Sequence, residues 1–193
     1  HASATAIGRL LAKHRFGADE VESVDMVTTY NPSVMAAHIR WPKTPLEGKF
    51  SPWYTTASLI VDGKLDLSSF TDAAFARPQV QELLKRVNIT QDREMAGRPH
   101  RAMGGQTWWD ISVKLKNGTC LVAERIEGHG DSYGWKDREA VYDRFRALAA
   151  HVLSAGQADS VLNAVMELEK SRNAADLMKL LVPVAAERRQ AAG

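Results

Sequence analysis

The clearest pattern of hydrophobic and polar positions lies between residues 107 and 116. Hydrophobic and polar residues alternate there, and one side of the segment carries Trp109, Ile111, Val113 and Leu115. A period of two is typical of a strand with one buried face. The dipeptide Asn117-Gly118 follows directly and predicts a type I′ hairpin turn. A return strand is then expected from residue 119 to about 126.

Weaker patterns predict the other elements. Two further strands are expected at residues 21–30 and 87–90, where β-branched residues are frequent. Helices are predicted at residues 2–15, 51–62, 69–76, 78–86, 136–153, 157–170 and 173–181. Gly17 is the expected C-terminal cap of the first helix, and Ser51-Pro52 is a strong start for the second. This order predicts an α+β fold in which a small antiparallel sheet with a hairpin is packed by helices and followed by C-terminal helices.

Composition narrows the class of protein. The chain has 193 residues, of which 45% are hydrophobic and 25% charged, as in an ordinary soluble domain. The net charge of +2 gives no sign of a nucleic-acid partner. No apolar run approaches the length of about 20 residues that spans a bilayer, so no membrane partner is expected. Cys120 cannot form an internal disulfide, which favours a cytoplasmic setting, and we expect it to be a small core residue.

Generic motifs for cofactors are absent from the sequence. It contains neither a Gly-x-Gly-x-x-Gly pattern nor a Gly-x-x-x-x-Gly-Lys-Ser/Thr pattern, which bind dinucleotides and phosphates respectively. The histidines are scattered, at positions 1, 14, 38, 100, 129 and 151. One cysteine and scattered histidines do not build a zinc site. We therefore expect no metal and no organic cofactor, and the residues alone indicate only a soluble α+β domain.

Four stretches nevertheless form a pattern in register. They are residues 1–6 (His-Ala-Ser-Ala-Thr-Ala), residues 48–57 (Gly-Lys-Phe-Ser-Pro-Trp-Tyr-Thr-Thr-Ala), residues 115–119 together with Gly128-His129 and Asp143-Arg144-Phe145, and residues 158–169. Together they resemble the MmgE/PrpD family, and the resemblance extends to about residue 181.

The resemblance implies a two-part enzyme. An all-helical domain comes mainly from the N-terminal half of the family's proteins, and a smaller α+β lid comes from the C-terminal half. Residues 1–15 would be a helix that belongs to or borders the helical domain, residues 16–134 the lid, and residues 135–193 the C-terminal helices and a frayed tail. The chain would then be a piece of a longer polypeptide or a subunit. It would need an N-terminal helical domain or subunit as partner and would form a homo-oligomer, most simply a homodimer.

The family's chemistry suggests the activity. Its members carry out 2-methylcitrate dehydration, cis-aconitate decarboxylation and iminodisuccinate epimerisation without an obligatory metal. We therefore expect a hydro-lyase of the 2-methylcitrate dehydratase kind that acts on a small polycarboxylate. The alternatives are a decarboxylase or isomerase of the same family, or a non-catalytic lid-type protein that partners a separate helical half.

Four residues match functional positions of the family. His1 would be a catalytic acid or base, and Tyr54 would donate a proton or hydrogen bond to the leaving or developing oxyanion. Lys49 would anchor a substrate carboxylate, and His129 would bind substrate from a loop. We expect all four to face one cleft. For Tyr54, packing in the core beside Trp53 is an equal alternative.

Overall fold

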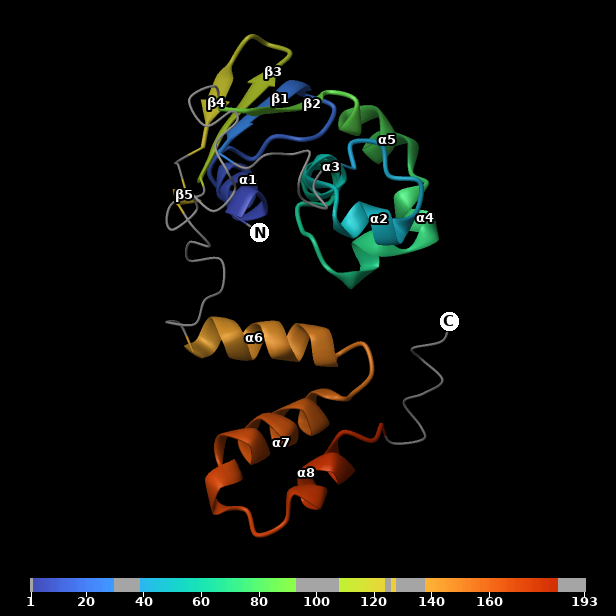
Figure 1. Cartoon of the computed structure of the whole chain (residues 1–193), viewed down its shortest axis with the longest axis vertical. Coiled ribbons are helices and arrows are strands. Elements are labelled where there is room, and N and C mark those ends of the chain that lie inside the picture. Colours follow the sequence, from blue (N-terminus) through green and yellow to red (C-terminus); the bar gives the residue numbers. More distant parts are fainter. Residues whose placement is uncertain (1, 30–38, 93–107, 124–125, 128–137, 184–193) are drawn as a thin grey trace. The chain divides into compact units, whose positions relative to one another are not determined.

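The computed structural model describes residues 2–29, 39–92, 108–123, 126–127 and 138–183 (Figure 1). The chain divides into two compact units, His1–Tyr133 and Gly134–Gly193. The first unit contains the sheet, and the second is helical in its described part. The fold is therefore α+β, as predicted. The division into three regions at residues 15 and 134 stays a prediction.

The described strands form one five-stranded sheet in the first unit. The strands are β1 (Val21–Thr28), β2 (Val87–Gln91), β3 (Trp108–Leu115), β4 (Cys120–Val122) and β5 (Ile126–Glu127). Their order is β2-β1-β3-β4, with β5 also paired to β3 (Figure 1). The β1–β2 pair is parallel and the other pairs are antiparallel. Strand β2 lies at one end of this order, and the predicted return strand is split into β4 and β5.

The hairpin between β3 and β4 is present, but its turn is not type I′. A type I′ turn needs a positive φ at both central residues, whereas Gly118 has φ 87° and Asn117 does not have a positive φ. The Gly118 N–H donates to the Leu115 carbonyl at 2.9 Å, and the Leu115 N–H donates to the Thr119 carbonyl at 2.8 Å. These bonds form a three-residue loop whose last residue is the left-handed glycine. The Asn117 side chain stabilises it by accepting from the Thr119 N–H at 2.9 Å.

The described part of the first unit also contains six helical segments. They are α1 (Ala2–His14), α2 (Pro45–Lys49), α3 (Pro52–Asp62), η2 (Leu67–Phe70), α4 (Asp72–Phe75) and α5 (Pro78–Leu84). The predicted start of α3 is confirmed, because the Ser51 side chain accepts from the Tyr54 N–H; Gly63, with φ 69°, is the C-terminal cap of this helix. The predicted cap of α1 is wrong. The left-handed residue is Arg15 (φ 51°), whose N–H donates to the Leu11 carbonyl, while the Gly17 N–H donates to the Glu20 carboxylate.

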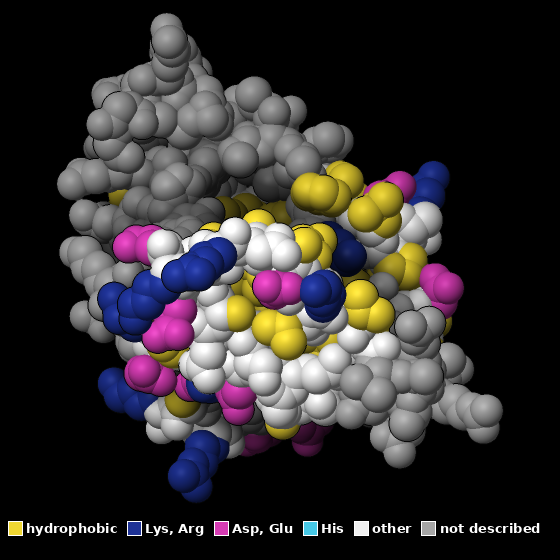
Figure 2. All heavy atoms as spheres, turned by 90° about the horizontal axis from the view of Figure 1, so that it is seen from below, with side chains coloured by type: hydrophobic (Ala, Val, Ile, Leu, Met, Phe, Trp, Pro, Cys, Tyr) yellow, Lys and Arg dark blue, Asp and Glu magenta, His cyan; other side chains and the backbone are white. Residues whose placement is uncertain are grey.

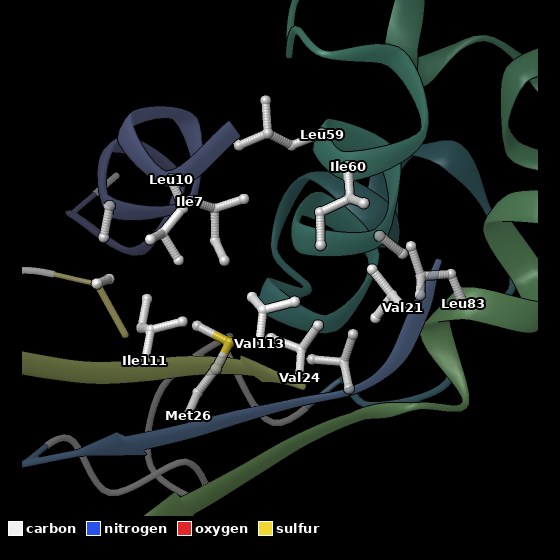
Figure 3. Close-up of a cluster of buried hydrophobic side chains, with 14 of the residues drawn as sticks. Ile7, Leu10, Val21, Val24, Met26, Leu59, Ile60, Leu83, Ile111 and Val113 are labelled. Carbon is white, nitrogen blue, oxygen red and sulfur yellow. The ribbon is translucent and has the colours of Figure 1, made fainter. Parts of the chain in front are cut away.

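The core of the first unit lies between one face of the sheet and helices α1 and α3. Figure 3 shows Ile7 and Leu10 of α1 above the sheet, with Ile60 of α3 beside them. The apolar side of β3 is buried as its alternation predicts, at Trp109, Ile111, Val113 and Leu115. Cys120 is a correction: its thiol is exposed, because Leu121 occupies the inward position on this short edge strand. The period of two then turns Cys120 outward.

The second unit contains α6 (Arg138–Ala149), α7 (Ala155–Met166), η5 (Leu168–Lys170) and α8 (Ala174–Leu180). These elements fall where three helices are predicted. Ser154 caps α7 by accepting from the Gln157 N–H at 3.3 Å, and Arg146 of α6 donates to Asp159 of α7 at 2.8 Å. None of the helices in the described part of the chain combines the length and the apolar character that crossing a bilayer requires.

Candidate active site

Two of the four predicted site residues lie in the described part of the chain. Lys49 ends α2, and Tyr54 lies in the first turn of α3, so one short junction carries both. His1 and His129 lie outside the described residues. The prediction that the four share a cleft therefore stays a prediction, and the geometry concerns the junction between α2 and α3.

Tyr54 is fully buried. Its ring packs against Phe75, with ring centroids 5.2 Å apart, and against Phe70, with centroids 6.0 Å apart. Its hydroxyl donates to the Ser69 carbonyl at 2.5 Å. Burial is the main cause that raises the pKa of the phenol. Tyr54 is thus a neutral core residue with a bonded hydroxyl, which is the packing role that the sequence left open.

Gly48 brings α2 against the Tyr54 ring. A β-carbon at position 48 would lie 2.9 Å from Cδ1 of that ring, so a larger residue would push the two helices apart. Gly48 is itself buried. The glycine of the Gly-Lys-Phe-Ser stretch therefore fixes the position of its neighbour Lys49 relative to α3.

Lys49 presents an exposed ammonium group at the same junction. Its Nζ lies 5.7 Å from the centre of the Phe70 ring. Among the described residues no carboxylate forms an ion pair with it, and the nearby Glu47 carboxylate accepts from the Lys43 backbone N–H at 2.6 Å. No described carboxylate therefore neutralises the positive charge of Lys49, which suits an anchor for a substrate carboxylate.

The polar side chains next to Tyr54 form a hydrogen-bonded group that could not be predicted from the sequence. Arg77 donates to both carboxylate oxygens of Asp62, at 2.6 and 2.7 Å. The Ser58 hydroxyl donates to the same carboxylate at 3.4 Å. Hydrogen bonding from Arg77 is the main cause that lowers the pKa of Asp62. The two partners are fifteen residues apart and no motif joins them, so only the packing of α3 against the α4–α5 segment reveals the pair.

A hollow in the described part of the first unit lies away from this junction. Its volume is about 1030 Å³, and it is lined by α1, residues 16–19, the end of α3 and α5. Leu11, Phe16 and Ile60 are among its apolar walls, whereas Lys49 and Tyr54 are not part of it. Within the described residues, no three histidine, cysteine, aspartate or glutamate side chains come together as a metal site would require.

Tyr54 and α1 lie on different sides of α3. Leu59 lies between α3 and α1 (Figure 3), and it is five residues after Tyr54. Five residues correspond to a rotation of about 140° around a helix. The Tyr54 ring accordingly faces the η2 and α4 side of α3 rather than α1.

Comparison with known proteins gives the family. The model of the MmgE/PrpD C-terminal domain matches residues 1–170. A cis-aconitate decarboxylase of Mus musculus is 27% identical over 167 residues, which cover 86% of this chain and 32% of that protein. A cis-aconitate decarboxylase of Homo sapiens is 26% identical over 155 residues, which cover 78% of this chain and 30% of that protein. The chain spans about a third of the length of these curated relatives, and it belongs to the MmgE/PrpD family, of which it carries the C-terminal domain.

Proposed function

We propose that this chain is the C-terminal, lid-type part of a lyase that acts on a small polycarboxylate without a metal. The observation that carries the proposal is the Lys49 ammonium, which is exposed, lacks a carboxylate partner among the described residues and lies within the Gly-Lys-Phe-Ser stretch of the family. A substrate with two or three carboxylates needs such a cation at a fixed position. Membership of the MmgE/PrpD family supports the same class of substrate.

Two reactions fit this proposal. The sequence favours dehydration of the 2-methylcitrate kind. The names of the two relatives instead favour decarboxylation of cis-aconitate. Both reactions need an acid or base beside a carbon that bears or adjoins a carboxylate, and both develop negative charge that must be stabilised. The two candidate reactions therefore share a substrate class, and they differ in which bond of the substrate breaks.

His1 remains the proposed acid or base and His129 a proposed substrate-binding residue. The elements next to them support a shared site, because α1 begins one residue after His1, β5 ends two residues before His129, and α1 contacts β5. Tyr54 remains a proposed donor. To act on substrate, its hydroxyl must break its hydrogen bond to the Ser69 carbonyl and donate to a substrate oxygen instead.

The activity is proposed for an assembly with an N-terminal helical domain or subunit, in a homo-oligomer. Catalysis requires groups that bind the transition state together, which half of a site does poorly. The alternative is a non-catalytic lid-type protein that serves a separate helical half. Turnover of a tricarboxylate that depends on this chain's own site residues would exclude this alternative.

The decisive experiment compares two lysine variants in the complete enzyme. Lys49→Met should raise KM for the tricarboxylate about tenfold or more, because a charge-assisted bond to a carboxylate contributes about 1.5–3 kcal/mol. Lys43→Met removes the same charge six residues away and should leave KM unchanged. Assaying both 2-methylcitrate and cis-aconitate, and identifying the product, would assign the reaction. Equal KM values for the two variants would contradict the role of Lys49.

A further inference from the structure

We propose that Phe70 is a positioning residue, whose ring holds the Lys49 ammonium where it meets a substrate carboxylate. The inference rests on the proposed function, because it takes Lys49 as the carboxylate anchor. It adds a residue that no sequence motif indicates, since Phe70 lies 21 positions after Lys49. The contact is the 5.7 Å approach of Nζ to the ring centre, within the distance of about 6 Å at which a cation is attracted to an aromatic face.

An aromatic partner suits this role better than a carboxylate would. Two other lysines of the first unit are held by acidic groups: Lys64 pairs with Asp66 at 2.7 Å, and Lys85 pairs with Glu82 at 2.5 Å. A carboxylate partner neutralises the ammonium and competes with an incoming carboxylate. A ring face orients the ammonium by its quadrupole, carries no net charge and leaves the N–H donors available to a substrate.

The Phe70 ring is itself held in place from two sides. It belongs to η2, whose start is closed by a reciprocal pair of bonds between Asp66 and Ser69. The Tyr54 hydroxyl donates to the Ser69 carbonyl, one residue before Phe70, and the Tyr54 ring packs on Phe70 at 6.0 Å. Tyr54 therefore acts on Lys49 through η2, in addition to its contact with Gly48.

In this arrangement the buried phenol acts on Lys49 without contact to substrate, which is separate from its proposed role as a donor. The Tyr54 ring and hydroxyl fix Phe70, Phe70 orients the ammonium, and Gly48 fixes the backbone from which Lys49 extends. Residues of α2, α3 and η2 thus act together on one charge. A lysine on a free surface would have no such support, and it would lose more side-chain entropy on binding a substrate.

The test uses two substitutions at position 70. Phe70→Leu keeps an apolar side chain but removes the aromatic face, and Phe70→Tyr keeps the face. In the complete enzyme, Phe70→Leu should raise KM for the tricarboxylate about two- to fivefold at unchanged kcat, the fold-change that corresponds to an exposed cation–π contact. Phe70→Tyr should restore KM. Leu67→Ala, an exposed change in the same helical segment, should leave KM unaltered.

A second readout does not depend on turnover. In the NMR spectrum of this chain, the methylene protons next to the Lys49 ammonium should be shifted upfield by the ring of Phe70. The shift should be lost in Phe70→Leu and kept in Phe70→Tyr, and the Lys43 signals should not change. Lys49 signals that match those of Lys43 in the unaltered chain would overturn the inference. The inference would also be overturned if Lys49→Met raises KM and Phe70→Leu leaves it unchanged. An unchanged KM in Lys49→Met would instead refute the proposed function.

Discussion

The two units of the chain differ sharply in how much of their hydrophobic surface they bury. In the first unit, buried residues from α1, α3, α5 and four strands form one continuous core (Figure 3). Among the described residues of the second unit, the buried hydrophobic set is Ala149, Leu153, Ala158 and Val161. Large hydrophobic side chains there remain exposed, at Leu148, Val152, Val165, Met166, Leu168, Met178, Leu181 and Val182. Figure 2 shows hydrophobic side chains at the surface between charged ones of both signs.

This difference in burial indicates which of the two units is the more stable. A sheet covered by helices offers each buried side chain neighbours from several elements, whereas three short helices enclose little volume. Helices of this length are marginal without tertiary packing. We therefore expect that opening the first unit requires a larger free energy than opening the second.

The largest effect should come from matched leucine truncations. Leu84 of the first unit is 1% exposed and Leu153 of the second is 7% exposed. Leu84→Ala should lower the free energy of unfolding of the first unit by about 3 kcal/mol, because it leaves a cavity in a closely packed core. Leu153→Ala should cost about half as much, since the small core of its unit can collapse. Amide hydrogen exchange measures each unit separately, and equal losses would contradict the comparison.

Tyr54→Phe probes a polar group inside the larger core. From sequence alone we expect this change to lower turnover about tenfold or more at nearly unchanged stability. The hydrogen bond from the Tyr54 hydroxyl to the Ser69 carbonyl changes the expected effect on stability. Loss of the hydroxyl should now cost about 1–2 kcal/mol of stability, because a buried carbonyl is left without its donor. Denaturation of the variant checks the stability, and kinetics of the complete enzyme check turnover. An unchanged free energy of unfolding would mean that Ser69 finds another donor.

The Asp62–Arg77 pair should make the stability of the first unit depend on pH. Because Arg77 lowers the pKa of Asp62 below its ordinary 3.8, the contribution is present above that value and is lost as pH falls through the folded pKa. Asp62→Asn should therefore destabilise the chain by about 1 kcal/mol at pH 7, an amount reduced by the partial exposure of Arg77, and by almost nothing in strong acid. Asp19→Asn, at an exposed position, is the matched control. A difference that persists in acid would mean that the amide disturbs packing instead.

The smallest effect should come from the exposed side chains of the second unit. Met178 is 61% exposed in α8, so Met178→Gln should change the free energy of unfolding by no more than about 0.5 kcal/mol. Thermal denaturation of the chain would measure this. A loss above about 1 kcal/mol would show that the side chain is covered in solution, and the contrast between the two units would then be smaller than their buried residues indicate.

The elements could be predicted best where a local rule decides them. The alternation in β3 predicts both the strand and its buried side, and Ser51 and Gly63 mark the two ends of α3. Local rules failed where two of them compete. Gly17 is a good cap by composition, but Arg15 follows the last turn of α1 directly and takes the left-handed conformation. Asn117-Gly118 likewise fits more than one turn type, and the bonds around Leu115 select one.

The site could be predicted only in part. The family motif singles out Lys49 and Tyr54, and one junction does carry both. The sequence left open whether the Tyr54 phenol faces a substrate or the core, because helical spacing does not tell which neighbour covers a face. Phe70, Ser69 and Arg77 belong to segments with no motif, so their relation to Tyr54 could not be foreseen.

Local properties of the chain were sufficient to predict the α+β class, the alternation of hydrophobic positions in β3 and the family, because periodicity, caps and motif residues can be recognised without knowing the packing. Only the tertiary structure decided that β2 pairs with β1 in parallel, that Cys120 faces outward and that the Tyr54 hydroxyl reaches Ser69. These features depend on which distant segments meet. The physical reason is that burial and hydrogen-bond partners arise from packing between elements, which no local pattern encodes.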